Sequence, residues 1–122
     1  MMLRKDSLQF RLCCFGLLTI LCGQSFAAPP EFVLEIRNHL FQPDTLTIPA
    51  NTKVKLVIYN RDPTPEEFES YELNREKVIL GGRKAIVFIG PLAPGVYPFF
   101  GEFNPQTALG TIVVVAASNV AE

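Results

Sequence analysis

Apolar and polar residues alternate in short segments along most of the chain. In the segments 32–37 and 53–59, apolar residues occupy every second position. A period of two is typical of β-strands that turn one face toward a core. Glycine and proline pairs such as Gly81-Gly82 and Pro94-Gly95 separate these segments as turns. The pattern therefore predicts an all-β sandwich of about seven strands, over 32–37, 45–48, 53–59, 77–80, 84–89, 96–100 and 111–115.

One segment interrupts the β pattern. Thr64-Pro65-Glu66-Glu67 has the residues of a helix start, with Thr as N-cap, Pro at the first helical position and Glu at the third. We therefore expect a short helix near 65–70. It would lie between two strands, where sandwich folds place functional loops.

Residues 1–27 have the features of a secretory signal peptide. Basic residues precede an apolar run over 12–21, and Ser25-Phe26-Ala27 offers the small residues that a signal peptidase reads. We expect cleavage after Ala27, a single domain over 28–122 and a periplasmic location. A lipoprotein anchor at Cys22 is a weaker alternative, because no small residue directly precedes this cysteine.

Cysteine and charge composition narrow the possible chemistry. All three cysteines (Cys13, Cys14 and Cys22) lie within the signal peptide, so the domain over 28–122 has no disulfide and no thiolate metal ligand. That domain carries eight basic and eleven acidic side chains, a net charge of −3. A mildly acidic domain has no electrostatic footprint for nucleic acid or anionic lipid. We therefore expect no nucleic-acid partner.

The C-terminal part of the chain carries a signature. Residues 97–104 read Tyr-Pro-Phe-Phe-Gly-Glu-Phe-Asn, and residues 108–114 read Ala-Leu-Gly-Thr-Ile-Val-Val. This resembles the cupredoxin signature Y-x-F-x-C-x-x-H followed by M-x-G-x-I-x-V, which implies a Greek-key β-sandwich of cupredoxin type. The Cys, His and Met ligand positions of that signature are Gly101, Asn104 and Ala108 here. Without thiolate, the chain lacks the basis of a blue-copper electron carrier.

The resemblance extends through the N-terminal half, in Phe41-x-Pro43 and Asn60-x-Asp62. In blue-copper domains the following stretch supplies the first histidine, and Glu66 stands at that position here. Residues 64–70 and 99–103 resemble small secreted cupredoxin-like proteins, similar to the cupredoxin part of bacterial iron-uptake proteins. This implies a copper or iron ion as cofactor and a membrane iron permease as candidate partner. Those relatives continue with His-Pro, where this chain has Asn104.

The candidate metal ligands are His39, Glu66, Glu69 and Glu102. His39 is the only histidine and follows the first predicted strand. In the cupredoxin topology the first and third strands run parallel, which would place His39 at the same end as Glu66 and the 101–104 loop. Imidazole and carboxylate together suit Cu(II), Zn(II) or iron.

Three of these four residues also have a simpler explanation, whereas Glu69 has none. His39 is equally explained as a partly exposed loop residue, and Glu66 as a favourable charge at a helix N-terminus. Glu102 can be a salt-bridge partner of the loop. The neighbouring Glu67 is accounted for by the capping box, and Glu76 by surface ion pairs.

Two functional hypotheses follow. The first is a periplasmic cupredoxin-like metal-binding accessory protein that binds copper or iron in connection with iron uptake, as a monomer or weak dimer. The alternative is a metal-free cupredoxin-fold protein-interaction module, favoured by Asn104. We expect no enzyme activity, because the sequence has no Ser-His-Asp spacing and no set of three histidines for zinc.

Overall fold

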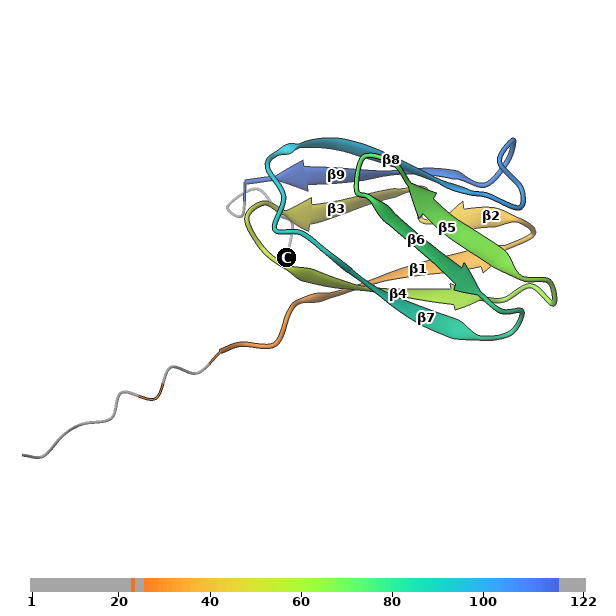
Figure 1. The fold of residues 1–122 in the computed structure, drawn as a ribbon, viewed down its shortest axis with the longest axis horizontal. Helices are drawn as coiled ribbons and strands as arrows, with labels where there is room; N and C mark the ends of the chain where they lie inside the picture. Colours follow the sequence, from red (N-terminus) through yellow and green to blue (C-terminus); the bar gives the residue numbers. More distant parts are fainter. Residues whose placement is uncertain (1–22, 24–25, 117–122) are drawn as a thin grey trace, which may run out of the picture.

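The structure, a computed structural model, describes residue 23 and residues 26–116, and it consists of two β-sheets packed face to face (Figure 1). The described residues form nine strands and no helix. The strands are β1 (Glu31–Arg37), β2 (Leu40–Gln42), β3 (Thr45–Pro49), β4 (Val54–Asn60), β5 (Glu66–Ser70), β6 (Arg75–Ile79), β7 (Lys84–Ile89), β8 (Gly95–Gly101) and β9 (Leu109–Val115).

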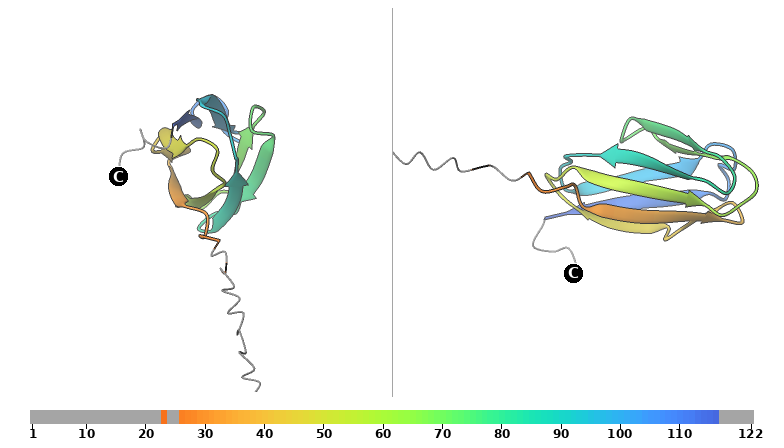
Figure 2. Two further views of the ribbon diagram at one scale, coloured as in Figure 1. Left: turned by 90° about the vertical axis from the view of Figure 1, so that its left-hand side faces the viewer. Right: turned by 90° about the horizontal axis from the view of Figure 1, so that it is seen from below.

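The two sheets have mixed topology. One has the strand order β2-β1-β4-β7 and the other β3-β9-β8-β5-β6. The pairs β1–β4 and β3–β9 are parallel, and the remaining pairs are antiparallel. Figure 2 shows the strands arranged around a common interior when the molecule is viewed from its end. The all-β sandwich is confirmed, and so is the parallel pairing of the first and third predicted strands, which are β1 and β4.

The helix predicted near 65–70 is wrong, because this segment is strand β5. Its residues alternate between buried and half-buried positions, which is the periodicity of a strand. β5 pairs with β6 on one side and β8 on the other, and these backbone hydrogen bonds outweigh the local capping preference of residues 64–67. β5 and the three-residue β2 raise the number of strands from the expected seven to nine within the described residues.

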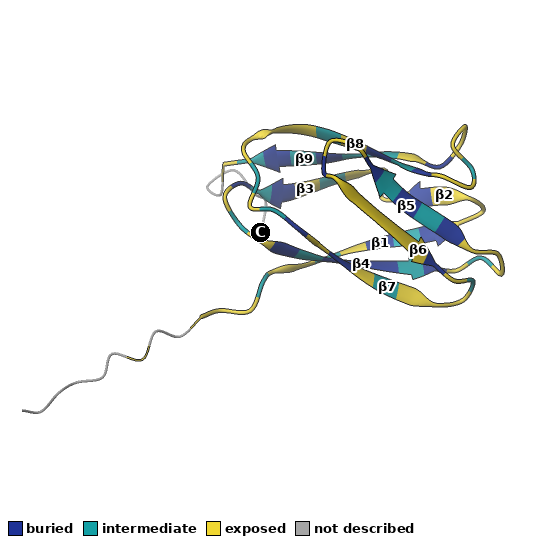
Figure 3. Ribbon diagram, viewed as in Figure 1, coloured by how far each residue is buried: buried dark blue, intermediate teal, exposed yellow. Residues whose placement is uncertain are grey.

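Buried residues occur along most strands of both sheets (Figure 3), and the core between the sheets contains a cluster of aromatic rings from β2, β5 and β8. Phe41 meets Phe99 edge to face, with ring centroids 4.9 Å apart, and Phe68 lies 5.1 Å from Phe99. Gly110 makes room for this cluster, since an added Cβ would lie 2.1 Å from Cζ of Phe99. Burying each such ring stabilises the fold by about 1.5–3 kcal/mol. The strands β5 and β8, which carry the candidate site, therefore pack against one another through this aromatic cluster.

The predicted signal peptide over 1–27 lies almost wholly outside the described residues. Cleavage after Ala27 and the domain boundaries therefore stay predictions. Within the described part of the chain, no helix has the length and apolar character that a membrane crossing requires.

Candidate functional site

Strand β5 and the loop between β8 and β9 bring the blue-copper positions together. Gly101, at the end of β8, donates its backbone N–H to the carbonyl of Ala108 at 2.7 Å. Ala108 in turn donates its N–H to the carbonyl of Asn104 at 2.9 Å, which folds the loop into a compact turn. Since β5 pairs with β8 next to this turn, the side chain of Glu66 lies against the loop.

The carboxylate of Glu66 is the centre of this arrangement. Its side chain is almost completely buried, with 1% of the residue exposed. Oε1 accepts hydrogen bonds from the backbone N–H of Glu67 at 3.0 Å and of Phe103 at 2.9 Å. Oε2 accepts a bond from Nδ2 of Asn104 at 2.6 Å. A buried carboxylate without partners would be strongly unfavourable, but these three donors compensate for its lost hydration.

Gly101 has no room for a side chain. An ideal Cβ at this position would lie 2.6 Å from Cδ of Glu66 and 2.7 Å from Cβ of Ala108. Glu66 therefore fills the space into which a cysteine at position 101 would point. The side chains at positions 66, 101 and 108 are thus sterically complementary: the large Glu66 is accommodated because Gly101 and Ala108 are small.

These residues do not fit a blue-copper ion. Such a centre takes a thiolate and two imidazoles, often with a weak thioether ligand. The Glu66–Asn104 pair offers one carboxylate and one amide, and the hydrogen-bond network assigns the amino group of Asn104 to the side that faces the carboxylate. An amino group of this kind is a donor only and cannot ligate a metal.

His39 has a structural role in the turn between β1 and β2. Asn38 and His39 form a two-residue hairpin turn in which both have positive φ, 52° and 59°. The carboxylate of Asp62 accepts hydrogen bonds from the backbone N–H of Asn38 at 2.8 Å and of His39 at 2.9 Å. The imidazole Nδ1 lies 3.7 Å from Asp62 Oδ2. The half-exposed ring thus has a local anionic neighbour.

The predicted position of His39 at the same end as the β8–β9 loop is confirmed for its backbone. The hydroxyl of Thr107 lies 3.5 Å from the carbonyl oxygen of His39. The side chain does not join the acids, however. Among the described residues, no group of three or more potential metal ligands contains His39.

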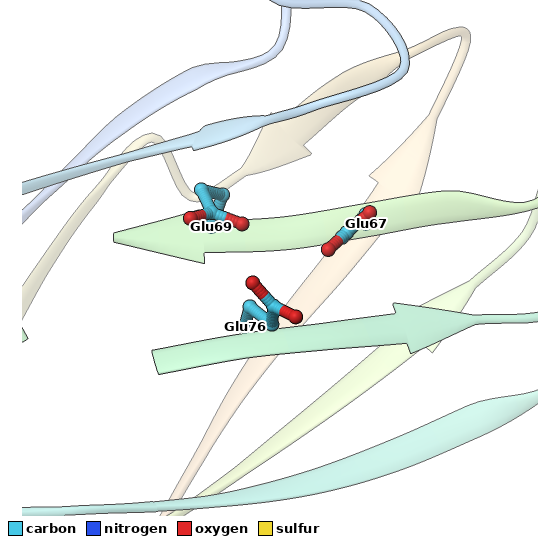
Figure 4. Close-up of side chains that lie close together, drawn as sticks. All are labelled: Glu67, Glu69 and Glu76. Atoms are coloured by element: carbon cyan, nitrogen blue, oxygen red, sulfur yellow. The ribbon is translucent and has the colours of Figure 1, made fainter. Parts of the chain in front are cut away.

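Glu69 lies on the outer face of β5, opposite Glu66, because successive side chains of a strand alternate between faces. There it forms the outer carboxylate cluster with Glu67 and Glu76, in which one carboxylate oxygen from each residue lies within 4.8 Å of those of the other two (Figure 4). Desolvation, followed by the charges of Glu76, Glu67 and Glu102, raises the pKa of the Glu69 carboxyl. Glu102 therefore contributes to the charge of this outer face.

The structure does not gather the four predicted ligands around one point. Glu66 is enclosed in the interior, Glu69 and Glu102 belong to the outer face, and His39 sits in a hairpin turn. Metal binding by any one of them stays a prediction. If residues 66–70 are read as a strand, alternation places the side chains of Glu66 and Glu69 on opposite faces of the sheet, so the two would not be predicted to share a metal ion.

Sequence reasoning also missed the partners of these residues. Glu76 lies opposite Glu69 across the β5–β6 pair, and Glu67 lies on the same face of β5 two residues before Glu69. The sequence pattern instead indicates a helix cap for Glu67 and surface ion pairs for Glu76. Asp62 was recognised only as part of a motif, and its contact with the turn spans more than 20 residues of sequence. Only the pairing of the strands brings such residues together.

The fold and the site define a cupredoxin-type β-sandwich whose blue-copper positions hold a hydrogen-bonded acid and amide. The sequence profile of the cupredoxin-like domain matches residues 11–114, and the chain belongs to this family. A protein of Rickettsia prowazekii (strain Madrid E), the uncharacterised RP394, is 42% identical over 84 residues, which span 69% of this chain and 67% of that protein.

Solved structures with the same fold include copper proteins. The metal-binding domain of the Cu(I)-exporting P-type ATPase CopA from Streptococcus pneumoniae D39, solved with Cu(I), matches with a TM-score of 0.64 and 13% identity, over 75% of this chain and 91% of that one. Auracyanin A, a blue copper protein of Chloroflexus aurantiacus, matches with a TM-score of 0.62 and 12% identity, over 72% and 100%. At these identities the similarity establishes the fold alone.

Proposed function

We propose that this chain is a metal-free cupredoxin-fold interaction module, a periplasmic binding protein that neither carries electrons nor turns over a substrate. The observation that supports this most strongly is the set of three donors that satisfies Glu66 where a copper ligand set would meet. When hydrogen bonds fill the blue-copper position, the sandwich serves as a scaffold. Its edges and loops are then available for recognition of a partner. The periplasmic location depends on the predicted signal peptide.

Equilibrium metal binding to the secreted chain, residues 28–122, tests this proposal. We expect neither Cu(II) nor Fe(II) to bind at Glu66 more tightly than about 100 μM, equivalent to about −5.5 kcal/mol. Glu66→Gln should therefore leave the titration unchanged, as should the matched exposed variant Glu102→Gln. Tight binding that is lost in Glu66→Gln and kept in Glu102→Gln would overturn the proposal.

The outer carboxylate cluster favours a second candidate, a metal-binding accessory protein that handles copper or iron for a membrane iron permease. The cluster presents one carboxylate oxygen each from Glu67, Glu69 and Glu76, and these three atoms lie within 4.8 Å of one another. Carboxylate oxygens are hard ligands that suit hard cations, iron among them, whereas Cu(II) binds more tightly where an imidazole is also present. The raised pKa of Glu69 reflects desolvation and repulsion among these charges, and a bound cation would relieve the repulsion.

The two candidates differ in which variant abolishes metal binding. The second candidate predicts binding that disappears in Glu69→Gln and in Glu76→Gln but persists in Glu66→Gln. Paramagnetic resonance of bound Cu(II) adds an independent criterion, because oxygen ligation is expected at this cluster. Nitrogen coupling that His39→Ala removes would instead assign the ion to the hairpin turn.

A further inference from the structure

The strands β6 and β7 are edge strands, one from each sheet, as are β2 and β3 at the opposite ends of the two sheets. β6 ends the five-stranded sheet and β7 ends the four-stranded sheet, and the structure pairs β6 only with β5 and β7 only with β4 among the described residues. The two edge strands lie next to each other and are joined by a short turn (Figure 1). Every second residue of an edge strand directs its backbone N–H and C=O away from the sheet. Backbone hydrogen-bonding groups thus line this side of the sandwich. The carbonyls of Phe88 and Ile79 already accept hydrogen bonds from the side chains of Arg75 and Asn60, at 2.9 and 3.0 Å.

A groove of about 490 Å³ lies between these edges, the β6–β7 groove. Its apolar lining includes Val78, Leu80 and Ile86, which are 46%, 62% and 40% exposed. Side chains of this kind on a strand edge favour contact with another polypeptide. β6 is the more accessible of the two strands, since four of its five residues are exposed, whereas half of the β7 residues are exposed.

The groove is also basic, although the domain as a whole is acidic. Lys77, Arg83 and Lys84 line it, and no acidic side chain does. None of these three makes an ion pair with another described residue. Lys84 also lies over the ring of Tyr59, 5.9 Å from its centroid. Cations that have no internal ion pair can bind a partner's carboxylates, and little desolvation is needed at an open surface.

We propose that an extended acidic segment of a partner protein binds in the β6–β7 groove as an added strand beside β6. Main-chain hydrogen bonds to β6 supply affinity, as in other cases of strand addition, and alternate side chains supply specificity. Apolar side chains of the segment contact Val78 and Leu80, while its carboxylates pair with Lys77 and Lys84. This inference rests on the proposed interaction role, for which it names the surface and the chemistry of the partner.

Charge argues against a second copy of this chain as the occupant. In a symmetric dimer the same patch lies on both sides of the interface, so Lys77, Arg83 and Lys84 would face the same cations of the other copy. Like charges brought together in this way disfavour association. An acidic segment has the complementary charge.

Fluorescence anisotropy with labelled peptides tests the proposal. The probe is an eight-residue peptide of alternating valine and glutamate, titrated with the secreted chain at about 50 mM salt so that charge contacts are only partly screened. We expect saturable binding, with no binding of the matching valine–lysine peptide. A proline–glutamate peptide lacks half of the backbone donors and should bind at least about fivefold more weakly.

Variants of the groove complete the experiment. Lys77→Glu combined with Lys84→Glu should weaken binding of the valine–glutamate peptide by at least about tenfold. Lys53→Glu is the matched control, because Lys53 lies over Phe88 outside the groove, and it should leave the affinity unchanged. Circular dichroism and thermal melting verify that the exposed substitutions leave the fold intact.

Three results would overturn the inference: no binding of the valine–glutamate peptide, equal binding by the double variant, or equal binding of the proline–glutamate peptide. Concentration-dependent dimerisation that the double variant abolishes would also overturn it, since the occupant would then be a second copy. The peptide experiment contains no metal. Its failure is therefore distinguishable from failure of the proposed function, which the metal titrations detect through Glu66→Gln.

Discussion

Oε2 of Glu66 and Nδ2 of Asn104 are 2.6 Å apart and join two segments that are 38 residues apart in sequence. Glu66 comes from β5, and Asn104 comes from the loop that follows β8. The bond ties this loop to the sheet at one end of the sandwich. Because the acceptor is a buried carboxylate, the bond is charge-assisted and its loss leaves a charge short of one donor.

Asn104→Ala should lower the free energy of unfolding by about 1–3 kcal/mol, because one oxygen of the buried Glu66 carboxylate loses its hydrogen-bond donor. Chemical denaturation of residues 28–122 measures the change. Glu102→Gln alters an exposed carboxylate two residues away and should change stability by less than about 0.5 kcal/mol. Equal stability of the Asn104→Ala and parent proteins would show that the pair contributes nothing.

The steric fit at Gly101 leads to a second prediction. Gly101→Cys alone should destabilise the protein by about 1–3 kcal/mol, since the new Cβ overlaps Glu66 and Ala108. It should also give no intense visible absorption with Cu(II). Absorption appears only when Glu66→His, Asn104→His and Ala108→Met are added, because the thiolate and both imidazoles are then present.

Optical titration with Cu(II) compares these variants. The informative control carries Gly101→Cys, Asn104→His and Ala108→Met but keeps Glu66. It should remain colourless because the carboxylate still occupies the thiolate position. A strong thiolate band from this control would mean that Glu66 moves aside readily, and the space-filling role assigned to it would fail.

The sequence was informative about the fold where one periodicity dominated. The alternating segments that form β1 and β4 have one face in the core, and an apolar–polar period of two records this directly. In β5 the local signals of a helix start competed with strand pairing. The hydrogen bonds from β6 and β8, which decide the outcome, belong to residues far away in sequence.

The candidate site was only partly predictable for the same reason. The signature aligned Gly101, Asn104 and Ala108 with the ligand positions, and the structure places them together with Glu66. The spacing of these residues in the sequence does not reveal which of their atoms are in contact. The bond from Asn104 to Glu66 depends on the pairing of β5 with β8, and the chain pattern does not encode that pairing locally.

Asp62 provides a third prediction, on the hairpin turn that contains His39. Asp62→Ala should lower the free energy of unfolding by about 1–3 kcal/mol, since it removes the acceptor for the N–H groups of Asn38 and His39. Denaturant titration measures the loss. Asp44→Ala is the control, because this exposed carboxylate accepts no hydrogen bond from a described residue, and it should be nearly neutral.

The positive φ of His39 offers an internal check on the same turn. His39→Gly relieves the left-handed strain of a residue with φ of 59° and should raise stability by up to about 1 kcal/mol. A large loss in His39→Gly would show that the imidazole itself stabilises the fold. The turn geometry would then be an incomplete account of this residue.

The outer carboxylate cluster gives the fourth prediction, which concerns pH. Desolvation and the neighbouring carboxylates raise the pKa of Glu69 in the folded protein. The folded state therefore binds a proton more readily than the unfolded state, and the contribution of Glu69 to stability declines as pH rises from the ordinary glutamate pKa through the raised one. Glu69→Gln should remove this penalty, and so stabilise the protein at about pH 7 and have little effect at about pH 3.

Thermal unfolding midpoints of the parent and Glu69→Gln proteins between about pH 3 and pH 7 measure the effect. The contribution of Glu35 to stability has the opposite pH dependence. Hydrogen bonds from Arg37 and Arg61 lower the pKa of the Glu35 carboxyl, so its stabilising contribution is lost as pH falls. That contribution is common to both proteins and cancels in their difference. Glu72→Gln removes an exposed charge outside the cluster and should give no pH-dependent gain. Glu69→Gln would contradict repulsion among the carboxylates if it raised the unfolding midpoint equally at both ends of the pH range. Protonation at low pH removes the repulsion in the parent protein, so the substitution should then have little effect.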